Sequence, residues 1–211
     1  LIRLIIENKN KIKLRDLINY SINLYKEQNY SFDTKFINEE LGDFILERLK
    51  NYMKDNNIRS DIIECSINSY GIDDLQKIYN KSSNLNKNIK KDFGNDVIAI
   101  YKRSSNILNS EIKSNPQIVG SADPGLFKND YEKKLYKKIH SIRKYFSSVG
   151  RDENYEESLK TLSSAKNEVN QFFDNVIVND QEEIIKKNRL ELLKMLCKSF
   201  ENYFNFSKIE A

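Results

Sequence analysis

The chain has little that would mark an enzyme. Its 211 residues include two cysteines, two prolines, six glycines and one histidine. No glycine-rich phosphate loop, Cys-x-x-Cys pair or nucleophile elbow occurs, so the commonest nucleotide, metal and hydrolase sites are excluded. The sequence therefore predicts no catalytic residue and no metal site in this chain.

Cysteine usage and hydropathy also limit where the chain works. Cys65 and Cys197 lie far apart, each in an apolar stretch with helical spacing, and we interpret both as buried thiols in a reducing compartment. No apolar run reaches the roughly 18 residues that a membrane span requires. The N-terminus lacks a start Met and a signal-peptide cleavage site, so we expect a cytoplasmic piece of a longer protein.

The charge balance is only mildly basic. Lys and Arg total 35 against 31 Asp and Glu, which gives a formal net charge of +4. Such a charge permits an anionic partner without requiring one. Lys, Asn and Ile are abundant, and because their codons are rich in A and T, the number of lysines alone carries little weight.

The apolar residues follow a helical period nearly throughout, which predicts an all-α bundle of about seven to nine helices. Residues 113–125 hold both prolines and form the clearest loop, which separates two helical subsets. Asp73 is predicted to cap one helix, and Asp180 and Glu183 fit a capping box. Only Val176 to Val178 could form a strand. The predicted helices are about 15–28, 35–55, 60–69, 73–90, 96–112, 127–147, 153–174 and 181–204.

The single histidine is a poor candidate for catalysis. His140 lies in a helical stretch with no Ser or Cys nucleophile motif beside it, so an ordinary position on a helix face is expected. Paired carboxylates such as Glu182 and Glu183 are adjacent in sequence and point to different helix faces. They fit helix-start charges better than an acid–base pair.

One helical turn, YKRSSN at 101–106, could bind an anionic ligand. Arg103 and Asn106 share a helix face, Lys102 is adjacent, and Tyr101 lies at the edge of the apolar stripe. An aromatic ring, an Arg and an Asn on one surface suit a single-stranded RNA loop, although a solvated helix face gives the same pattern. The basic stretch 128–144 is a second candidate, suited to a phosphate backbone.

The segment FFDNVIV at 172–178 predicts a corner between the last two helices. Phe172 and Phe173 end one helix, and Asp174 and Asn175 lie at its terminus, where small polar side chains satisfy free backbone groups. Arg189 lies near the apolar stripe of the last helix, so it must pair or reach a cleft. We predict a hydrogen-bonded contact between Asp174 and Arg189 that braces the corner presenting Asn175.

Several stretches together resemble a known family. The chain is similar to the C-terminal part of the β subunit of bacterial heterotetrameric glycyl-tRNA synthetases, whose last helices resemble the DALR anticodon-binding module of arginyl-tRNA synthetases. The DALR tetrapeptide itself is absent, and EEIIKKNRLELLK stands in its place. The resemblance is carried by FILERLKNYMKDNNIRSDIIECSI (44–67), YKRSSNIL (101–108), VNQFFDNVIV (169–178) and KNRLELLKML (187–196).

The resemblance implies a role in attaching glycine to its tRNA. Residues 1–33 would be the tail of a preceding HD-type helical domain, and 34–211 an anticodon-binding helical domain. The partners implied are glycine tRNA and an α subunit in an α2β2 assembly. The α subunit would use ATP, and this part would need no cofactor. A helical docking domain that holds the β subunit to its partner without touching RNA is the alternative. The residues implied to face tRNA are Tyr101, Lys102, Arg103, Asn106, Asn175, Lys187, Asn188 and Arg189, with Phe172, Phe173 and Asp174 as the structural corner.

Overall fold

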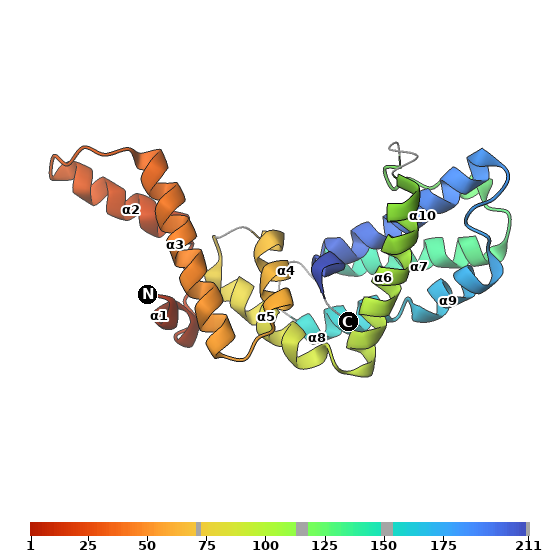
Figure 1. Cartoon of the computed structure of the whole chain (residues 1–211), viewed down its shortest axis with the longest axis horizontal. Coiled ribbons are helices and arrows are strands. Elements are labelled where there is room, and N and C mark those ends of the chain that lie inside the picture. The colour runs from red at the N-terminus through yellow and green to blue at the C-terminus, as the bar shows by residue number, and fades with distance from the viewer. Residues whose placement is uncertain (71–72, 113–117, 149–153, 210–211) are drawn as a thin grey trace. The chain divides into compact units, whose positions relative to one another are not determined.

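The computed structural model describes residues 1–70, 73–112, 118–148 and 154–209, drawn in colour in Figure 1. Their contacts divide the chain into two compact units, residues 1–86 and 87–211. Over the described residues there are ten α-helices, two 3-10 turns and no strand, which confirms the all-α prediction. None of the described helices has an apolar stretch of the kind that crosses a bilayer. The contact boundary differs from the predicted one at 33/34, and the assignment of 1–33 to a preceding HD-type domain stays a prediction.

The first unit is built from short and long helices around an Ile-rich core. Buried apolar side chains such as Leu14, Leu49 and Ile62 recur at helical spacing, as the sequence predicted. A buried contact between the hydroxyls of Ser82 and Ser66, 2.6 Å apart, joins two of the helices. The helices are α1 (Ile2–Glu7), α2 (Leu14–Glu27), α3 (Thr34–Asp55), α4 (Ser60–Tyr70) and α5 (Leu75–Asn88), the last of which runs into the second unit.

The start of α5 differs from the prediction by one residue. Asp74, and not Asp73, caps the helix, since its Oδ1 accepts a hydrogen bond from the backbone N–H of Lys77 at 2.9 Å. Asp73 instead ties α2 to this turn, because its carbonyl accepts from the backbone N–H of Leu14 at 2.9 Å. Its carboxylate also accepts from the backbone N–H of Arg15 at 3.3 Å. Of these two adjacent acids, Asp74 caps α5 and Asp73 binds the start of α2.

The second unit begins with a tight turn after α5. The helix predicted over 73–90 ends at Asn88, and the next helix starts at Asp92. A Cβ on Gly94 would lie 2.2 Å from the carbonyl oxygen of Asn88, so only glycine fits. The elements are α6 (Asp92–Ile112), η1 (Pro124–Leu126), α7 (Asp130–Ser148), α8 (Tyr155–Ser163), α9 (Lys166–Asn175), α10 (Glu183–Glu201) and η2 (Phe206–Lys208).

The single helix predicted over 153–174 is wrong, because the structure breaks it into α8 and α9. The break falls at Ser164 and Ala165, where the backbone N–H of Ala165 bonds to the carbonyl of Leu162 in a tightened last turn. The Ser164 hydroxyl donates to the Thr161 carbonyl at 2.6 Å. Serine side chains compete with the helix for backbone groups in this way. The redirected chain buries both Leu162 and Val169.

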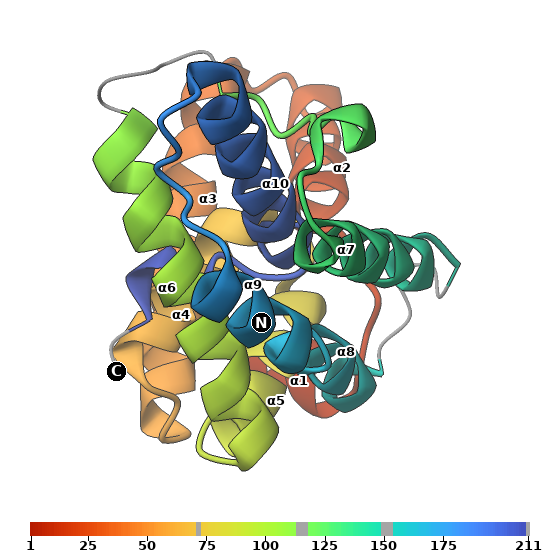
Figure 2. The same cartoon turned by 90° about the vertical axis from the view of Figure 1, so that its right-hand side faces the viewer.

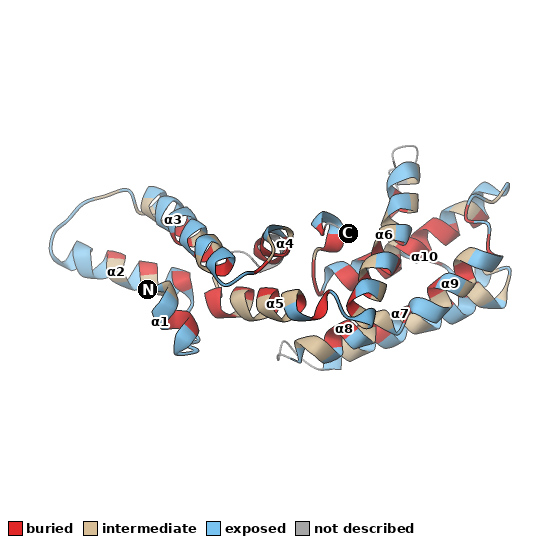
Figure 3. Ribbon diagram, turned by 60° about the horizontal axis from the view of Figure 1, so that its bottom comes forward, coloured by how far each residue is buried: buried red, intermediate tan, exposed pale blue. Residues whose placement is uncertain are grey.

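The last long helix, α10, is the centre of the second unit. It packs against α6 and α7, and Figure 3 shows it buried along most of its length. Tyr101, Phe200, Phe204 and Phe206 form an aromatic cluster at its C-terminal part. The predicted capping box at its start is wrong. Asp180 lies before the helix, where its Oδ1 accepts from the backbone N–H of Glu182 at 3.0 Å.

Candidate nucleic-acid interface

The helices α6 and α9 lie side by side along a seam (Figure 2). At its start, Lys166 pairs with Asp96 at 2.6 Å. At its end, Glu111 pairs with Lys186 at 2.8 Å and accepts from Asn179 Nδ2 at 3.0 Å. Hydrogen bonds from Lys186 and Asn179 lower the pKa of Glu111, while its carboxylate raises the pKa of Lys186, so both stay charged near neutral pH. Polar pairs therefore hold α6 to α9 near the start of the seam and α6 to α10 near its end.

Arg103 and the FFDN segment meet in the middle of this seam. The Cζ atom of Arg103 lies 4.4 Å from the centroid of the Phe173 ring, a cation–π contact. Its Nη2 lies 3.8 Å from Oδ1 of Asp174, close enough for attraction but too far for a hydrogen bond. The Arg103 and Asp174 side chains remain 47% and 66% exposed. Two sequence pieces some 70 residues apart thus form one surface, and the term Arg103 cluster below means Arg103, Phe173 and Asp174.

Four more of the predicted tRNA-facing residues also lie wholly or partly on the surface. Asn106, Asn175 and Lys187 are exposed, and Lys102 is half-buried. The Asn175 amide donates to the carbonyl of Gln171, one turn back on α9, at 2.9 Å. Cationic and amide groups on α6, α9 and α10 are therefore open to solvent.

Three other predicted residues lie inside the protein. Tyr101 is 4% exposed and donates its hydroxyl to Glu201 at 2.8 Å. Asn188 is 5% exposed and forms a two-way contact with the backbone of Asp123, accepting from its N–H at 2.7 Å and donating to its carbonyl at 3.0 Å. The third, Arg189, is also buried. In this conformation none of the three side chains is open to an RNA ligand.

The predicted contact between Asp174 and Arg189 is wrong. Arg189 donates from Nε to Glu132 at 2.8 Å and from Nη1 to Asp180 at 2.5 Å and to the carbonyl of Ile177 at 2.8 Å. A buried guanidinium needs acceptors at the same depth. Glu132 is fully buried, whereas Asp174 is largely exposed and faces Arg103. The corner is still braced by Arg189, with the core side formed by the buried Phe172.

Glu132 is a residue that the sequence reasoning missed. Its Oε2 accepts from the backbone N–H groups of Lys128 at 2.8 Å and Asn129 at 3.0 Å. The Asn129 side chain in return accepts from the backbone N–H of Glu132 at 3.1 Å. This is a capping box that starts α7. The Asn-x-x-Glu spacing at 129–132 was the signal that could have found it.

Glu191 was missed as well, and no local signal points to it. Its carboxylate is 5% exposed and accepts from the backbone N–H groups of Val119 at 3.1 Å, Gly120, and Ser121 at 3.0 Å. Gly120 has φ of +84°, a left-handed conformation that favours glycine. The contact joins residues about 70 positions apart, so it depends on the tertiary fold.

Comparison with known proteins shows which family the chain belongs to. Residues 97–211 match the DALR anticodon binding domain. The chain belongs to this family. Over 209 residues, or 99% of its length, it is 35% identical to a glycine–tRNA ligase beta subunit from Rickettsia canadensis (strain McKiel) and 33% identical to one from Rickettsia africae (strain ESF-5). It spans about 30% of the length of these relatives. The resemblance expected from the sequence is confirmed.

The DALR match and the surface coincide. The matched residues 97–211 include the Arg103 cluster and every residue that the sequence predicted to face tRNA. The match leaves out the whole of the first unit, 1–86. The second candidate stretch, 128–144, is inside it, but Lys133 pairs with Asp130 and Lys138 with Glu168. The Arg103 cluster is therefore the stronger candidate site.

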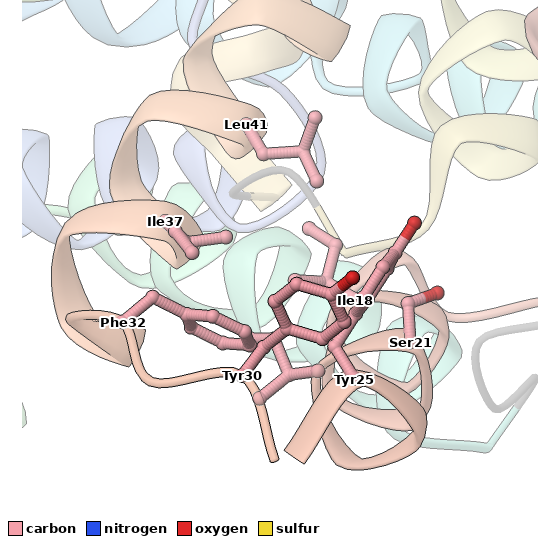
Figure 4. A pocket seen from close by; sticks show the side chains of 8 residues that line it. Ile18, Ser21, Tyr25, Tyr30, Phe32, Ile37 and Leu41 are labelled. Atoms are coloured by element: carbon pink, nitrogen blue, oxygen red, sulfur yellow. The ribbon is translucent and has the colours of Figure 1, made fainter. Parts of the chain in front are cut away.

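A pocket of about 300 Å³ opens between α2 and α3 in the first unit (Figure 4). It is lined by aliphatic and aromatic side chains and by Ser21, whose hydroxyl donates to the Leu17 carbonyl at 3.0 Å. Tyr25 meets Tyr30 edge-on, with ring centroids 5.9 Å apart. The lining residues are Ile18, Ser21, Ile22, Tyr25, Tyr30, Phe32, Ile37 and Leu41, none of which carries a charge.

The histidine and the two cysteines of this DALR family member lie on helices α7, α4 and α10. His140 is exposed and lies against the Tyr136 ring, with centroids 4.4 Å apart. Cys65 and Cys197 are buried thiols, as predicted, and burial raises the pKa of Cys197 to about 12. Within the described ranges, no three His, Cys, Asp or Glu residues gather as a metal site would require.

Proposed function

We propose that this chain binds the anticodon arm of a tRNA through the exposed α6–α9 seam. One observation carries the proposal: inside the region matched by an anticodon-binding family, an exposed arginine is stacked on a phenylalanine. Proteins bind single-stranded RNA loops through such surfaces. Unstacked bases stack on the aromatic ring or the guanidinium, and polar side chains form hydrogen bonds with the base edges. The buried Glu132–Arg189–Asp180 contacts hold the corner beneath.

The exposed polar side chains of the proposed surface suit two different parts of an RNA. Lys102 and Lys187 carry charges suited to phosphates, which give binding that weakens as salt is raised. Asn106 and Asn175 offer amides that can donate to and accept from base edges. Among the described residues, Asp174 is the acid paired with Arg103, and its carboxylate faces the same solvent.

The names of the relatives extend the proposal to a whole enzyme. They are glycine–tRNA ligase beta subunits, so we infer that the RNA is glycine tRNA and that the chain serves a ligase. In this proposal a partner α subunit, in an α2β2 cytoplasmic enzyme, uses ATP and forms the activated glycine. The chain itself binds no cofactor. Purified alone, it should not charge tRNA when supplied with glycine and ATP.

A pair of arginine variants tests the proposed surface. Arg103→Ala should weaken binding of a glycine-tRNA anticodon stem-loop by about tenfold, since it removes both the charge and the platform. Arg48→Ala is the matched control, because Arg48 is an exposed arginine of the first unit that also lies over a ring, that of Phe44, at 5.1 Å. Fluorescence anisotropy with the stem-loop and a scrambled-loop RNA gives both affinities.

Equal affinities of the wild type for the two RNAs would reject anticodon-arm recognition. Equal losses in the two arginine variants would reject the α6–α9 seam as its location. If the chain binds neither RNA but captures the α subunit, the docking alternative replaces this proposal.

A further inference from the structure

Large apolar side chains at the surface are concentrated in the first unit. Of the thirteen that are exposed among the residues the structure describes, ten lie within residues 1–44. Single exposed apolar residues are ordinary, but a gathering of them on one part of a protein marks a contact surface. The ten residues are Leu1, Leu4, Ile12, Tyr20, Leu24, Tyr25, Tyr30, Phe36, Leu41 and Phe44.

The helix α2 lacks the charged outer side of an ordinary surface helix. Ile18 and Ile22 are buried, but Tyr20 and Leu24, on nearly the opposite side of the helix, are apolar as well and are 63% and 41% exposed. Residues 17–25 include no charged side chain, although 31% of the whole chain is charged. A helix that is apolar on most of its sides is usually covered on most of them.

The pocket between α2 and α3 opens within this apolar surface (Figure 4). Three of its lining residues, Tyr25, Tyr30 and Leu41, are 55%, 60% and 37% exposed, so the pocket is open to solvent. Small-molecule sites carry a few convergent polar groups that orient the ligand, and this lining offers little of that kind. Its volume of about 300 Å³ and its apolar walls suit large apolar side chains of another protein segment.

The helix α3 continues the surface and gives it a charged edge. Phe44 follows Leu41 by one turn and is 55% exposed. Glu40 and Asp43 are exposed and lie one turn apart beside this apolar stripe. A partner that lies along the stripe therefore gains from Lys or Arg side chains at its edge, facing these acids.

We propose that this surface binds a helical segment of the same polypeptide, outside the 211 residues described by this sequence. The term α2–α3 face below means the pocket together with Leu24 and Phe44. The relatives match 99% of this chain, which spans only 30% and 29% of their length, so proteins of this kind have further segments that can cover it. The segment presents large apolar side chains to the pocket and basic ones to Glu40 and Asp43. Amphipathic helices bind apolar grooves in this way.

The composition of the face favours a permanent contact within one polypeptide over a contact with a separate protein. Permanent interfaces resemble the inside of a domain, whereas surfaces that meet water between encounters are more polar. The uncharged stretch 17–25 fits the first kind. A tether within one chain also raises the effective concentration of the segment. The inference concerns the first unit and does not depend on the proposed binding of RNA by the second.

The test compares the 211-residue chain with the complete polypeptide that its natural gene encodes. Hydroxyl-radical footprinting followed by mass spectrometry measures how fast each side chain is oxidised. Tyr25 and Tyr30 should react readily in the 211-residue chain and several-fold more slowly in the complete polypeptide. Ile177, which is 76% exposed in the second unit, is the internal control and should react equally in both.

A lysine substitution tests the location of the contact. In the 211-residue chain Phe44→Lys faces water and should shift the melting temperature by less than about 3 °C. In the complete polypeptide it places an ammonium in an apolar contact and repels the basic edge of the segment. It should therefore return the oxidation of Tyr25 and Tyr30 to the rate of the 211-residue chain. Ile177→Lys is the matched control and should leave both tyrosines protected.

Four outcomes would overturn the inference. The natural gene encodes no further residues, or Tyr25 and Tyr30 react equally in the two forms. Phe44→Lys leaves the tyrosines protected in the complete polypeptide. The tyrosines become protected in the 211-residue chain as its concentration rises, which would make a second copy of the chain the occupant. The proposed function stands in each case, because its own test uses RNA and the second unit.

Discussion

At the scale of single residues, the described arginines of the second unit differ in whether their N–H groups form hydrogen bonds inside the protein. Arg189 is fully engaged with Glu132, Asp180 and a backbone carbonyl, and Arg143 with Ser199 and Met195. Arg103 holds only a ring and a distant carboxylate. The same side chain therefore serves stability where its acceptors are buried, and in the proposed function it serves recognition where the protein supplies no hydrogen-bond acceptor.

Arg189→Ala should destabilise the second unit strongly. The change leaves Glu132, which is fully buried, without its cation, and breaking a buried pair by removing one partner commonly costs about 3–5 kcal/mol. Urea denaturation followed by circular dichroism gives the free energy of unfolding. Arg103→Ala is the control and should change it by less than about 1 kcal/mol, since exposed ion pairs contribute little. A loss below about 1 kcal/mol in Arg189→Ala would contradict the bracing role.

Lys81 gives a stability that depends on pH. Its side chain is 1% exposed, and burial, with a smaller contribution from the charge of Lys77, lowers its pKa from 10.5 to about 6. The unfolded chain then binds a proton that the folded chain does not between these two values, so stability rises with pH across that window. Below about pH 6 the burial of Lys81 lowers the free energy of unfolding by its full amount.

Lys81→Met removes this linkage while keeping a similar shape. The variant should be more stable than the wild type near pH 6, and the gap should narrow by at most about 1.4 kcal/mol per pH unit as pH rises. Unfolding free energies at pH 6, 7.5 and 9 check it. A gap that stays constant with pH would show that Lys81 keeps its ordinary pKa.

At the scale of elements, one face of α10 holds the segment 118–123. Asn188, Glu191, Met195 and Lys198 follow one another at helical spacing and all contact it. Lys198 donates to the Val119 carbonyl at 2.6 Å. The helix thus uses polar residues, several of them buried, to hold a segment whose sequence shows no helical or strand pattern.

Glu191→Ala should release this segment without unfolding the helices. Three backbone N–H groups lose their acceptor, and each buried hydrogen bond to a charged group is worth about 1.5–3 kcal/mol. Amide hydrogen exchange at Val119, Gly120 and Ser121 should become much faster, while α10 stays protected. Glu183→Ala, at the exposed start of α10, is the control and should leave those amides slow. Unchanged exchange in Glu191→Ala would contradict the fastening role.

The sequence predicted most helices because a buried stripe fixes their period. It did not predict the break after Ser163, since propensity alone does not tell a bend from a continuous helix. It also misjudged Asp180, whose spacing to Glu183 fits a capping box although its carboxylate is used by Glu182 and Arg189. Short motifs fail where a tertiary partner competes for the same side chain.

At the scale of the whole molecule, the candidate site was predictable in part. The stretches at 101–106 and 172–175 were identified from the sequence, but nothing in it showed that Arg103 lies on Phe173. The sequence paired Asp174 with Arg189 because they are neighbours along the chain. Spatial neighbours 71 positions apart, Arg103 and Asp174, come together only when α6 packs against α9.

Hydrogen exchange of the 211-residue chain with and without a glycine-tRNA anticodon stem-loop tests the central claim most directly. RNA bound at the Arg103 cluster should slow exchange in α6 around 101–109 and in residues 170–178, at and just after the end of α9. It should leave α2 and α3 unchanged, because they lie in the other unit. The account predicts that this slowing disappears with Arg103→Ala at the same RNA concentration. Slowing confined to 14–55, or to α7 alone, would contradict it.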